Sequence, residues 1–163
     1  MKCISPITLK IQNPRNKDGK AIVPCGKCIP CLINRRESWI VRLIEHHKRF
    51  PAVFITLTYN DSNITNREHP TSLYKCDLQH FFKRLRKNTN KKVTYYAVGE
   101  YGTRTRRPHY HSIIFADDLP TGDQIAAAWS IDGKSIGHVT VTPLNMRRLV
   151  YTTKYHLNQG NYP

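Results

Sequence analysis

Two histidines separated by one residue, His109 and His111, have the type and spacing that suit a metal site. They lie in residues 108–115, whose alternating apolar pattern predicts a β-strand. Residues two apart on a strand point to the same face, with Cα atoms roughly 6.6 Å apart, so both imidazoles can converge on one ion. Two half-exposed histidines on a purely structural strand would show the same pattern, so the pair alone leaves both interpretations open.

A carboxylate is expected beside this pair. The strand predicted over residues 93–101 is joined to the histidine strand by a short polar loop, so the two strands must pair antiparallel. If Tyr101 faces Pro108, then Glu100 faces His109 and becomes a third ligand. Two imidazoles and one carboxylate, with positions left for water and phosphate oxygens, suit Mg²⁺ or Mn²⁺. The loop adds three arginines that we expect to bind DNA phosphates: Arg104, Arg106 and Arg107.

Two tyrosines, Tyr151 and Tyr155, lie four residues apart in a helix predicted over residues 145–157. Such positions share one helix face about 6 Å apart, so both phenols could reach one scissile phosphate. A tyrosine is a poor nucleophile at its free pKa of about 10, and Lys154 and a metal-polarised phosphate are the groups that would activate it. Tyrosines that pack a buried helix would look the same in the sequence.

The cysteines suggest a second metal site. Cys25, Cys28 and Cys31 are each separated by two residues, and Cys3 could complete a tetrahedral zinc site if the N-terminal segment folds back. The alternatives are reduced thiols at the start of a helix or an iron–sulfur cluster. We expect the fifth cysteine, Cys76, to serve packing. Because the number is odd and we detect no export signal, we expect a reducing compartment and no disulfides.

The charge points to a polyanionic partner. The 163 residues contain 26 Lys and Arg against 11 Asp and Glu, giving a formal net charge of +15 and a pI near 9.9. Nucleic acid is the expected partner, although such charge could also serve only solubility. No stretch approaches the roughly 20 apolar residues that span a bilayer, so we expect no membrane association. Further DNA contacts are expected from one basic helix: Lys83, Arg84 and Arg86.

The elements that must position these groups can be predicted from periodicity. The sequence indicates one domain over residues 1–163, with an irregular cysteine-containing segment to about residue 31. Apolar positions at helical spacing and alternating β-branched or aromatic segments then follow one another. The pattern predicts an α+β fold with helices packed on an antiparallel sheet. Its helices are expected at 31–50, 77–87, 123–129 and 145–157, and its strands at 53–59, 93–101, 108–115 and 138–142.

Together these motifs resemble the HUH superfamily, specifically the replication-initiation proteins of microviruses, in their gokushovirus branch. The resemblance covers most of the chain and implies the HUH endonuclease fold, a relative of the RRM and ferredoxin-like folds, with about five antiparallel strands. It implies that the histidines ligate a metal on a central strand and that Tyr151 acts first. The residues that carry the resemblance are Pro24–Cys31 followed by Trp39, Phe54–Tyr59, Asp77–Arg86, Gly99–Gly102, Arg107–His111 and Tyr151–Tyr155.

The resemblance implies a rolling-circle initiator that nicks a single-stranded DNA origin, forms a 5′-phosphotyrosine, leaves a free 3′-OH and rejoins strands. It also implies host replication proteins as partners and the cytoplasm of a bacterial host as location. A non-catalytic DNA-binding module and a tyrosine transposase or relaxase are the alternatives. The sequence departs from the family at His156, where related chains carry a lysine soon after the second tyrosine, and we expect related chains to continue beyond Pro163.

Overall fold

A computed structural model describes residues 2–12, 19–65 and 72–154. Their contacts fall into two compact units, which are treated separately below. The first comprises residues up to Leu43 together with the chain from Thr153, and the second comprises Ile44–Thr152. No helix in the described part of the chain combines the length and the apolar character needed to cross a membrane.

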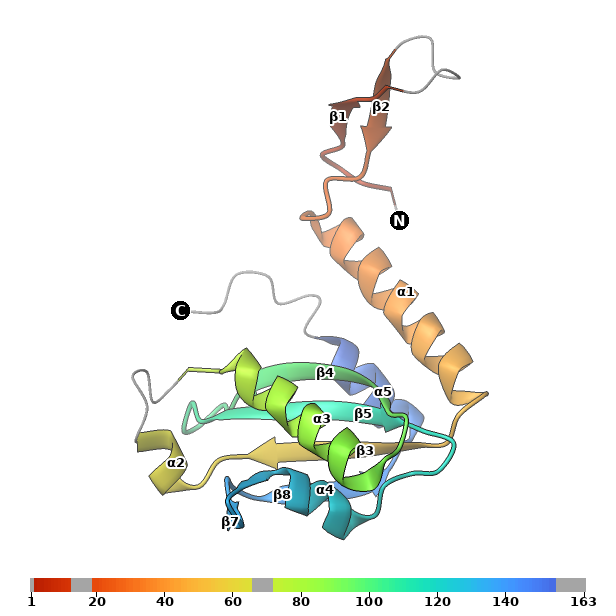
Figure 1. The fold of residues 1–163 in the computed structure, drawn as a ribbon. Helices are drawn as coiled ribbons and strands as arrows, with labels where there is room; N and C mark the ends of the chain where they lie inside the picture. The colour runs from red at the N-terminus through yellow and green to blue at the C-terminus, as the bar shows by residue number, and fades with distance from the viewer. Residues whose placement is uncertain (1, 13–18, 66–71, 155–163) are drawn as a thin grey trace. The chain divides into compact units, whose positions relative to one another are not determined.

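The second unit is built on a four-stranded antiparallel sheet with the order β4-β5-β3-β8 (Figure 1). β-Branched and aromatic residues dominate these strands, as expected for a half-buried pleated surface. Their bounds are Ala52–Thr58 for β3, Thr94–Tyr101 for β4, Pro108–Phe115 for β5 and Val139–Pro143 for β8.

The α+β class predicted from the sequence is confirmed, and the architecture is consistent with an HUH endonuclease fold. The described sheet has four strands, each at a position that the periodicity predicted, whereas the resemblance implied about five. The histidine strand β5 is central, as implied, because β4 and β3 pair on its two sides. A short hairpin of β6 (Ser130–Ile131) and β7 (Lys134–Ser135) forms a separate sheet.

One face of the sheet packs on two helices, α3 (Lys75–Thr89) and α4 (Gly122–Ala128). Every second side chain of β3 and β5 enters this core, where it meets aromatic residues of α3 and the fully buried Trp129. Burying one such large apolar side chain stabilises the fold by about 1.5–3 kcal/mol. Trp129 also donates its Nε1–H to the carbonyl of Thr58 at 2.8 Å, which ties the end of α4 to the sheet.

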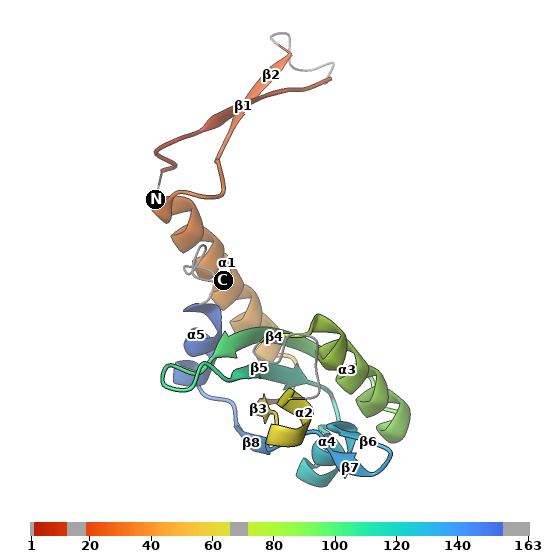
Figure 2. The same cartoon turned by 90° about the vertical axis from the view of Figure 1, so that its left-hand side faces the viewer.

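The opposite face carries α5 (Met146–Thr153), so the sheet lies between α3 and α5 in Figure 2. The helix follows β8 directly, and the side chain of Asn145 accepts the backbone N–H of Arg148 at 2.9 Å, as an N-terminal cap does. Leu149 is 2% exposed and anchors the helix. The helix was predicted over residues 145–157; residues 155–157 lie outside the described residues. The short helix α2 (Asp61–Thr65) follows β3.

The first unit contains an antiparallel hairpin of β1 (Ile7–Lys10) and β2 (Lys20–Val23), followed by most of α1 (Ile29–His47). The hairpin corrects the expectation that the first 30 residues are irregular. Its strands have four residues each, which is too short for an alternating pattern to emerge above the surrounding turn signals.

Candidate active site

The register that the loop length predicted is confirmed. Tyr101 pairs with Pro108, Glu100 with His109 and Val98 with His111. Directly opposed residues share a face, so Glu100 and both histidines lie on the side of the sheet away from α3. The tyrosine between the histidines points into the core, where it is 3% exposed.

The three polar side chains converge closely enough to share one ion. Glu100 Oε2 lies 3.1 Å from His111 Nε2 and 3.5 Å from His109 Nε2, and all three candidate ligand atoms lie within 4.8 Å of one another. Adjacent ligands of an octahedral ion bound at about 2.1 Å are about 3.0 Å apart, so the spacing fits a divalent cation. The side chains are only 11–19% exposed, which limits competition from water.

Hydrogen bonds hold both imidazoles with Nε2 toward the carboxylate. His109 Nδ1 lies 3.2 Å from the carbonyl of Arg107, and because a carbonyl only accepts, Nδ1 carries the proton and leaves the Nε2 lone pair for a ligand. His111 Nδ1 lies 3.0 Å from Thr56 Oγ1 on β3. Such partners fix the orientation of a metal-ligating imidazole.

Tyr151 reaches the same group from α5. Its hydroxyl donates to Glu100 Oε2 at 2.8 Å, and its ring meets that of His111 edge-on at 5.3 Å between centroids. The side chain remains 37% exposed, so a substrate can approach the phenol. Residues more than 40 positions apart in the sequence thus meet at one point. Lys154 directly follows α5 and is partly buried in the first unit, and Tyr155 lies outside the described residues.

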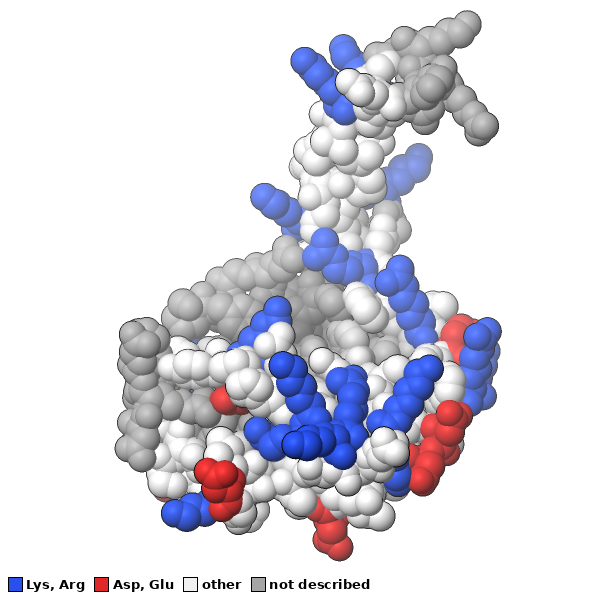
Figure 3. Space-filling view, viewed as in Figure 1, with Lys and Arg blue, Asp and Glu red and all other residues white. Residues whose placement is uncertain are grey.

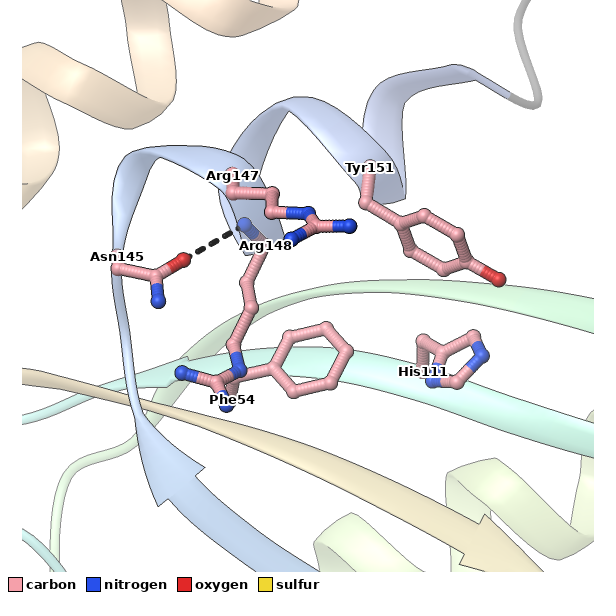
Figure 4. A pocket seen from close by; sticks show the side chains of 6 residues that line it. All are labelled: Phe54, His111, Asn145, Arg147, Arg148 and Tyr151. Carbon is pink, nitrogen blue, oxygen red and sulfur yellow. Dashed lines mark hydrogen bonds between the residues drawn. The ribbon is translucent and has the colours of Figure 1, made fainter.

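A pocket of about 350 Å³ adjoins the phenol (Figure 4). Tyr151 and His111 border it on one side, and Arg147 and Arg148 project from α5 on the other. The sequence analysis missed these arginines, although their spacing of three and four residues from Tyr151 places them on the same helix face. The lining residues are Phe54, His111, Asn145, Arg147, Arg148 and Tyr151.

The loop arginines differ in their surroundings. Arg104 and Arg106 are exposed, and the Arg106 guanidinium lies over the Tyr101 ring at 5.5 Å. Arg107 forms an ion pair with Asp61 and donates to the carbonyl of Tyr59 at 2.8 Å, so it connects the loop to the end of β3. These contacts give Arg107 a structural role in addition to any contact with DNA.

The basic residues of α3 are not brought to this site, because α3 covers the other face. Arg84 donates to the carbonyl of Ala128 at 2.8 Å, and burial lowers its pKa. Arg86 donates twice to the carbonyl of Val93, at 3.2 and 2.8 Å, whereas Lys83 is exposed. Figure 3 shows Lys and Arg gathered over this face, so the basic surface is not confined to the side of the histidines.

The four cysteines proposed for zinc come together in the first unit, within 4.8 Å of one another. Hydrogen bonding from the backbone of Ile4 lowers the pKa of the Cys28 thiol to about 6, while burial raises the pKa of Cys31 to about 12. Cys76 lies apart on α3 and is exposed, which corrects the expectation that it is a packing residue.

Comparison with known proteins adds the family. The model of the replication-associated protein ORF2 family matches residues 52–160. The chain is 32% identical over 134 residues to replication-associated protein VP4 of Bdellovibrio phage phiMH2K, covering 71% of this chain and 41% of that protein. It is 31% identical over 157 residues to replication-associated protein ORF2 of Spiroplasma virus 4, covering 82% and 47%.

The chain thus spans less than half the length of these two relatives. A solved structure, that of the hypothetical protein ORF119 from Sulfolobus islandicus rod-shaped virus 1, aligns with a TM-score of 0.46 at 14% identity, covering 76% of this chain and 97% of that one. The family match covers the sheet, both helical layers and the residues of the candidate site. The chain belongs to the replication-associated protein ORF2 family of phage replication proteins.

Proposed function

We propose that this protein initiates rolling-circle replication by cutting single-stranded DNA with Tyr151 as the nucleophile and a divalent metal as cofactor. The observation that carries the proposal is the 2.8 Å contact between the Tyr151 hydroxyl and the carboxylate that faces both histidines. A nucleophile, a metal-binding group and an open pocket at one place are the components that phosphoryl transfer requires. The chemistry is that of an HUH tyrosine endonuclease.

The three ligands would be Glu100, His109 and His111, and their donor set suits Mg²⁺ or Mn²⁺. Such an ion, when bound, polarises the scissile phosphate and stabilises the negative charge that develops on its oxygens. Arg107 O and Thr56 Oγ1 hold the imidazoles so that both Nε2 atoms face the same point. The orientation exists before substrate binds, which reduces the reorganisation needed during reaction.

In the proposed step, Tyr151 Oη attacks the phosphorus, a new O–P bond forms and the bond from phosphorus to the 3′-oxygen breaks. The phenolic hydrogen already points at Glu100 Oε2, which gives the departing proton an acceptor. The leaving 3′-oxygen takes up a proton from solvent and becomes the free 3′-OH. The phosphodiester energy is retained in the 5′-phosphotyrosine, so a later attack by a 3′-OH can rejoin the strand.

The pocket beside Tyr151 offers a path for the strand. Arg147 and Arg148 supply positive charge along one wall, and Phe54 supplies an aromatic ring on which a base could stack. The substrate is therefore proposed to be the single-stranded origin, held by phosphate contacts next to the metal. Replication proteins of the host and its cytoplasm are the proposed partners and location, in line with the phage relatives.

The test is covalent capture. The protein is incubated with Mn²⁺ and single-stranded oligonucleotides that carry a randomised central segment, and protein–DNA adducts are separated on a denaturing gel and sequenced. We expect adducts that need the metal and share a sequence. Tyr151→Phe should abolish them or reduce them strongly.

Tyr95→Phe is the matched control, because Tyr95 is similarly exposed at 39% but lies at the far end of β4. It should form adducts at the normal level. Adducts that persist unchanged in a Tyr151→Phe, Tyr155→Phe double variant would end the mechanism. Binding that is sensitive to salt but never yields a cut strand would instead favour the non-catalytic DNA-binding module.

A further inference from the structure

Four cysteine sulfurs meet at one point in the first unit, far apart in sequence but close in space. Cys3 Sγ lies 3.6 Å from Cys25 Sγ and 3.7 Å from Cys28 Sγ, and Cys31 joins them within 4.8 Å. Four sulfurs bound tetrahedrally at about 2.3 Å from one ion are about 3.8 Å apart. All four are free thiols, so the cluster has the dimensions of a single-ion site.

The backbone around the cluster is arranged to support thiolates. The N–H of Cys28 donates to Cys25 Sγ at 3.4 Å, and the N–H of Cys25 donates to Cys3 Sγ at 3.3 Å. The first of these bonds closes a tight turn in which Gly26 has φ +74°, a conformation that other residues rarely adopt. N–H groups directed at sulfur stabilise its anionic form, which is the form that binds metal.

The sulfurs connect three separate pieces of chain. Cys3 precedes β1, Cys25 and Cys28 form the turn after β2, and Cys31 is in the first turn of α1. An ion bound to all of them would fix both ends of the hairpin to the start of the helix. Without it, that connection would depend on apolar packing.

Apolar packing is sparse there. Within residues 2–12 and 19–43, the buried apolar side chains are Cys31, Leu32 and Leu43. The hairpin instead exposes its larger side chains: Ile7 and Leu9 are each 46% exposed, and Ile22 is 77% exposed. A segment this small with so little core usually needs a metal or a disulfide to stay folded.

We propose that Cys3, Cys25, Cys28 and Cys31 bind one structural Zn²⁺ that joins the N-terminal hairpin to α1. Four thiolates form a closed coordination sphere with no position for a substrate, so the ion is structural. Soft sulfur ligands select zinc over the oxygen-preferring ions suited to Glu100 and the histidines. A cluster of several iron atoms would hold its cysteine sulfurs farther apart than a single shared ion does.

The first measurement is metal content. The chain is purified without added metal and without chelator, and its metals are quantified by mass spectrometry. We expect about one zinc per chain. Cys28→Ser should lose most of it, and Cys76→Ser, which alters the one cysteine outside the cluster, should keep it. Iron in place of zinc, or equal zinc in the two variants, would overturn the assignment.

Cobalt provides a test that does not depend on how a variant folds. Co²⁺ is titrated into wild-type chain that has been stripped of zinc with a chelator under reducing conditions. Tetrahedral thiolate coordination should give intense visible bands and sulfur-to-cobalt charge-transfer absorption that saturate at one equivalent, and one equivalent of Zn²⁺ should remove them. Weak bands typical of octahedral oxygen or nitrogen ligation would overturn the proposal.

Hydrogen exchange then tests the structural role. On removal of zinc, the amides of β1 and β2 should lose protection, while those of β5 should keep theirs, because β5 has its own buried core. Unchanged protection in the hairpin would contradict the role proposed for the ion. The outcome is independent of DNA cleavage, so failure here and failure of the nicking proposal can be told apart.

Discussion

Thr56 should control the affinity of the proposed catalytic metal without touching it. Its hydroxyl oxygen lies 3.0 Å from His111 Nδ1, and β3 places it directly opposite that histidine. Thr56→Val keeps the shape of the side chain and the β-branch but removes the hydrogen bond. The imidazole then loses the group that fixes its rotation, while Glu100 and His109 keep their places.

The expected loss can be worked from this contact. A hydrogen bond between neutral groups contributes about 0.5–1.5 kcal/mol, and removing a partner that orients a metal ligand typically lowers affinity about 10- to 100-fold. The lower part of that range applies, because one histidine of two is affected. We therefore expect Mn²⁺ to bind about tenfold more weakly, a difference of about 1.4 kcal/mol.

The assay is isothermal titration of Mn²⁺ into zinc-loaded protein, so that the cysteine cluster does not compete. Thr140→Val is the matched control, since Thr140 pairs with Thr56 across β8 but is exposed. Thr140→Val should bind Mn²⁺ as the wild type does. If Thr56→Val also binds within twofold of the wild type, the argument that this hydroxyl orients His111 is wrong.

Three further predictions follow from particular contacts. Arg147→Gln, in the pocket wall, should weaken binding of single-stranded DNA and reduce its salt dependence by about one ion, as measured by fluorescence anisotropy over a salt series, whereas Lys83→Gln on the other face should change binding less. Tyr110→Phe should lower the free energy of unfolding in urea by about 1–3 kcal/mol, because the phenol both accepts the N–H of Tyr74 and donates to its carbonyl, each at 2.9 Å, and an unchanged midpoint would contradict this. Burial raises the pKa of Tyr96 to about 12, so the folded state holds this proton more tightly than the unfolded state; stability should be complete below about pH 10 and fall as pH rises toward 12, and Tyr96→Phe should flatten that decline in a pH series of urea titrations.

The sequence sufficed where local geometry decides the outcome. A short loop fixed the pairing of Glu100 with His109, and strand alternation put His111 on the same face. Helical spacing identified Tyr151 as a candidate, and the structure brings its hydroxyl to Glu100. In each of these cases, the residues involved lie on one element or on two neighbours in sequence.

Partners that depend on distant pairing could not be predicted in the same way. Thr56 reaches His111 only because β3 pairs with β5 across 55 residues of chain, and no loop length fixes that register. Phe54 enters the pocket for the same reason. The basic residues of α3 were predicted from charge alone, but charge does not reveal that Arg84 and Arg86 donate to backbone carbonyls.

Mapping the covalent bond tests the central claim most directly. Trypsin cleaves after Arg148 and Lys154, so the resulting peptide of residues 149–154 contains Tyr151 but not Tyr155. Adducts formed with Mn²⁺ are digested with nuclease and trypsin and analysed by tandem mass spectrometry. A nucleotide attached through its 5′-phosphate to Tyr151 is the expected result. Attachment to a residue outside this peptide, or attachment that forms equally well without a divalent ion, would contradict the account.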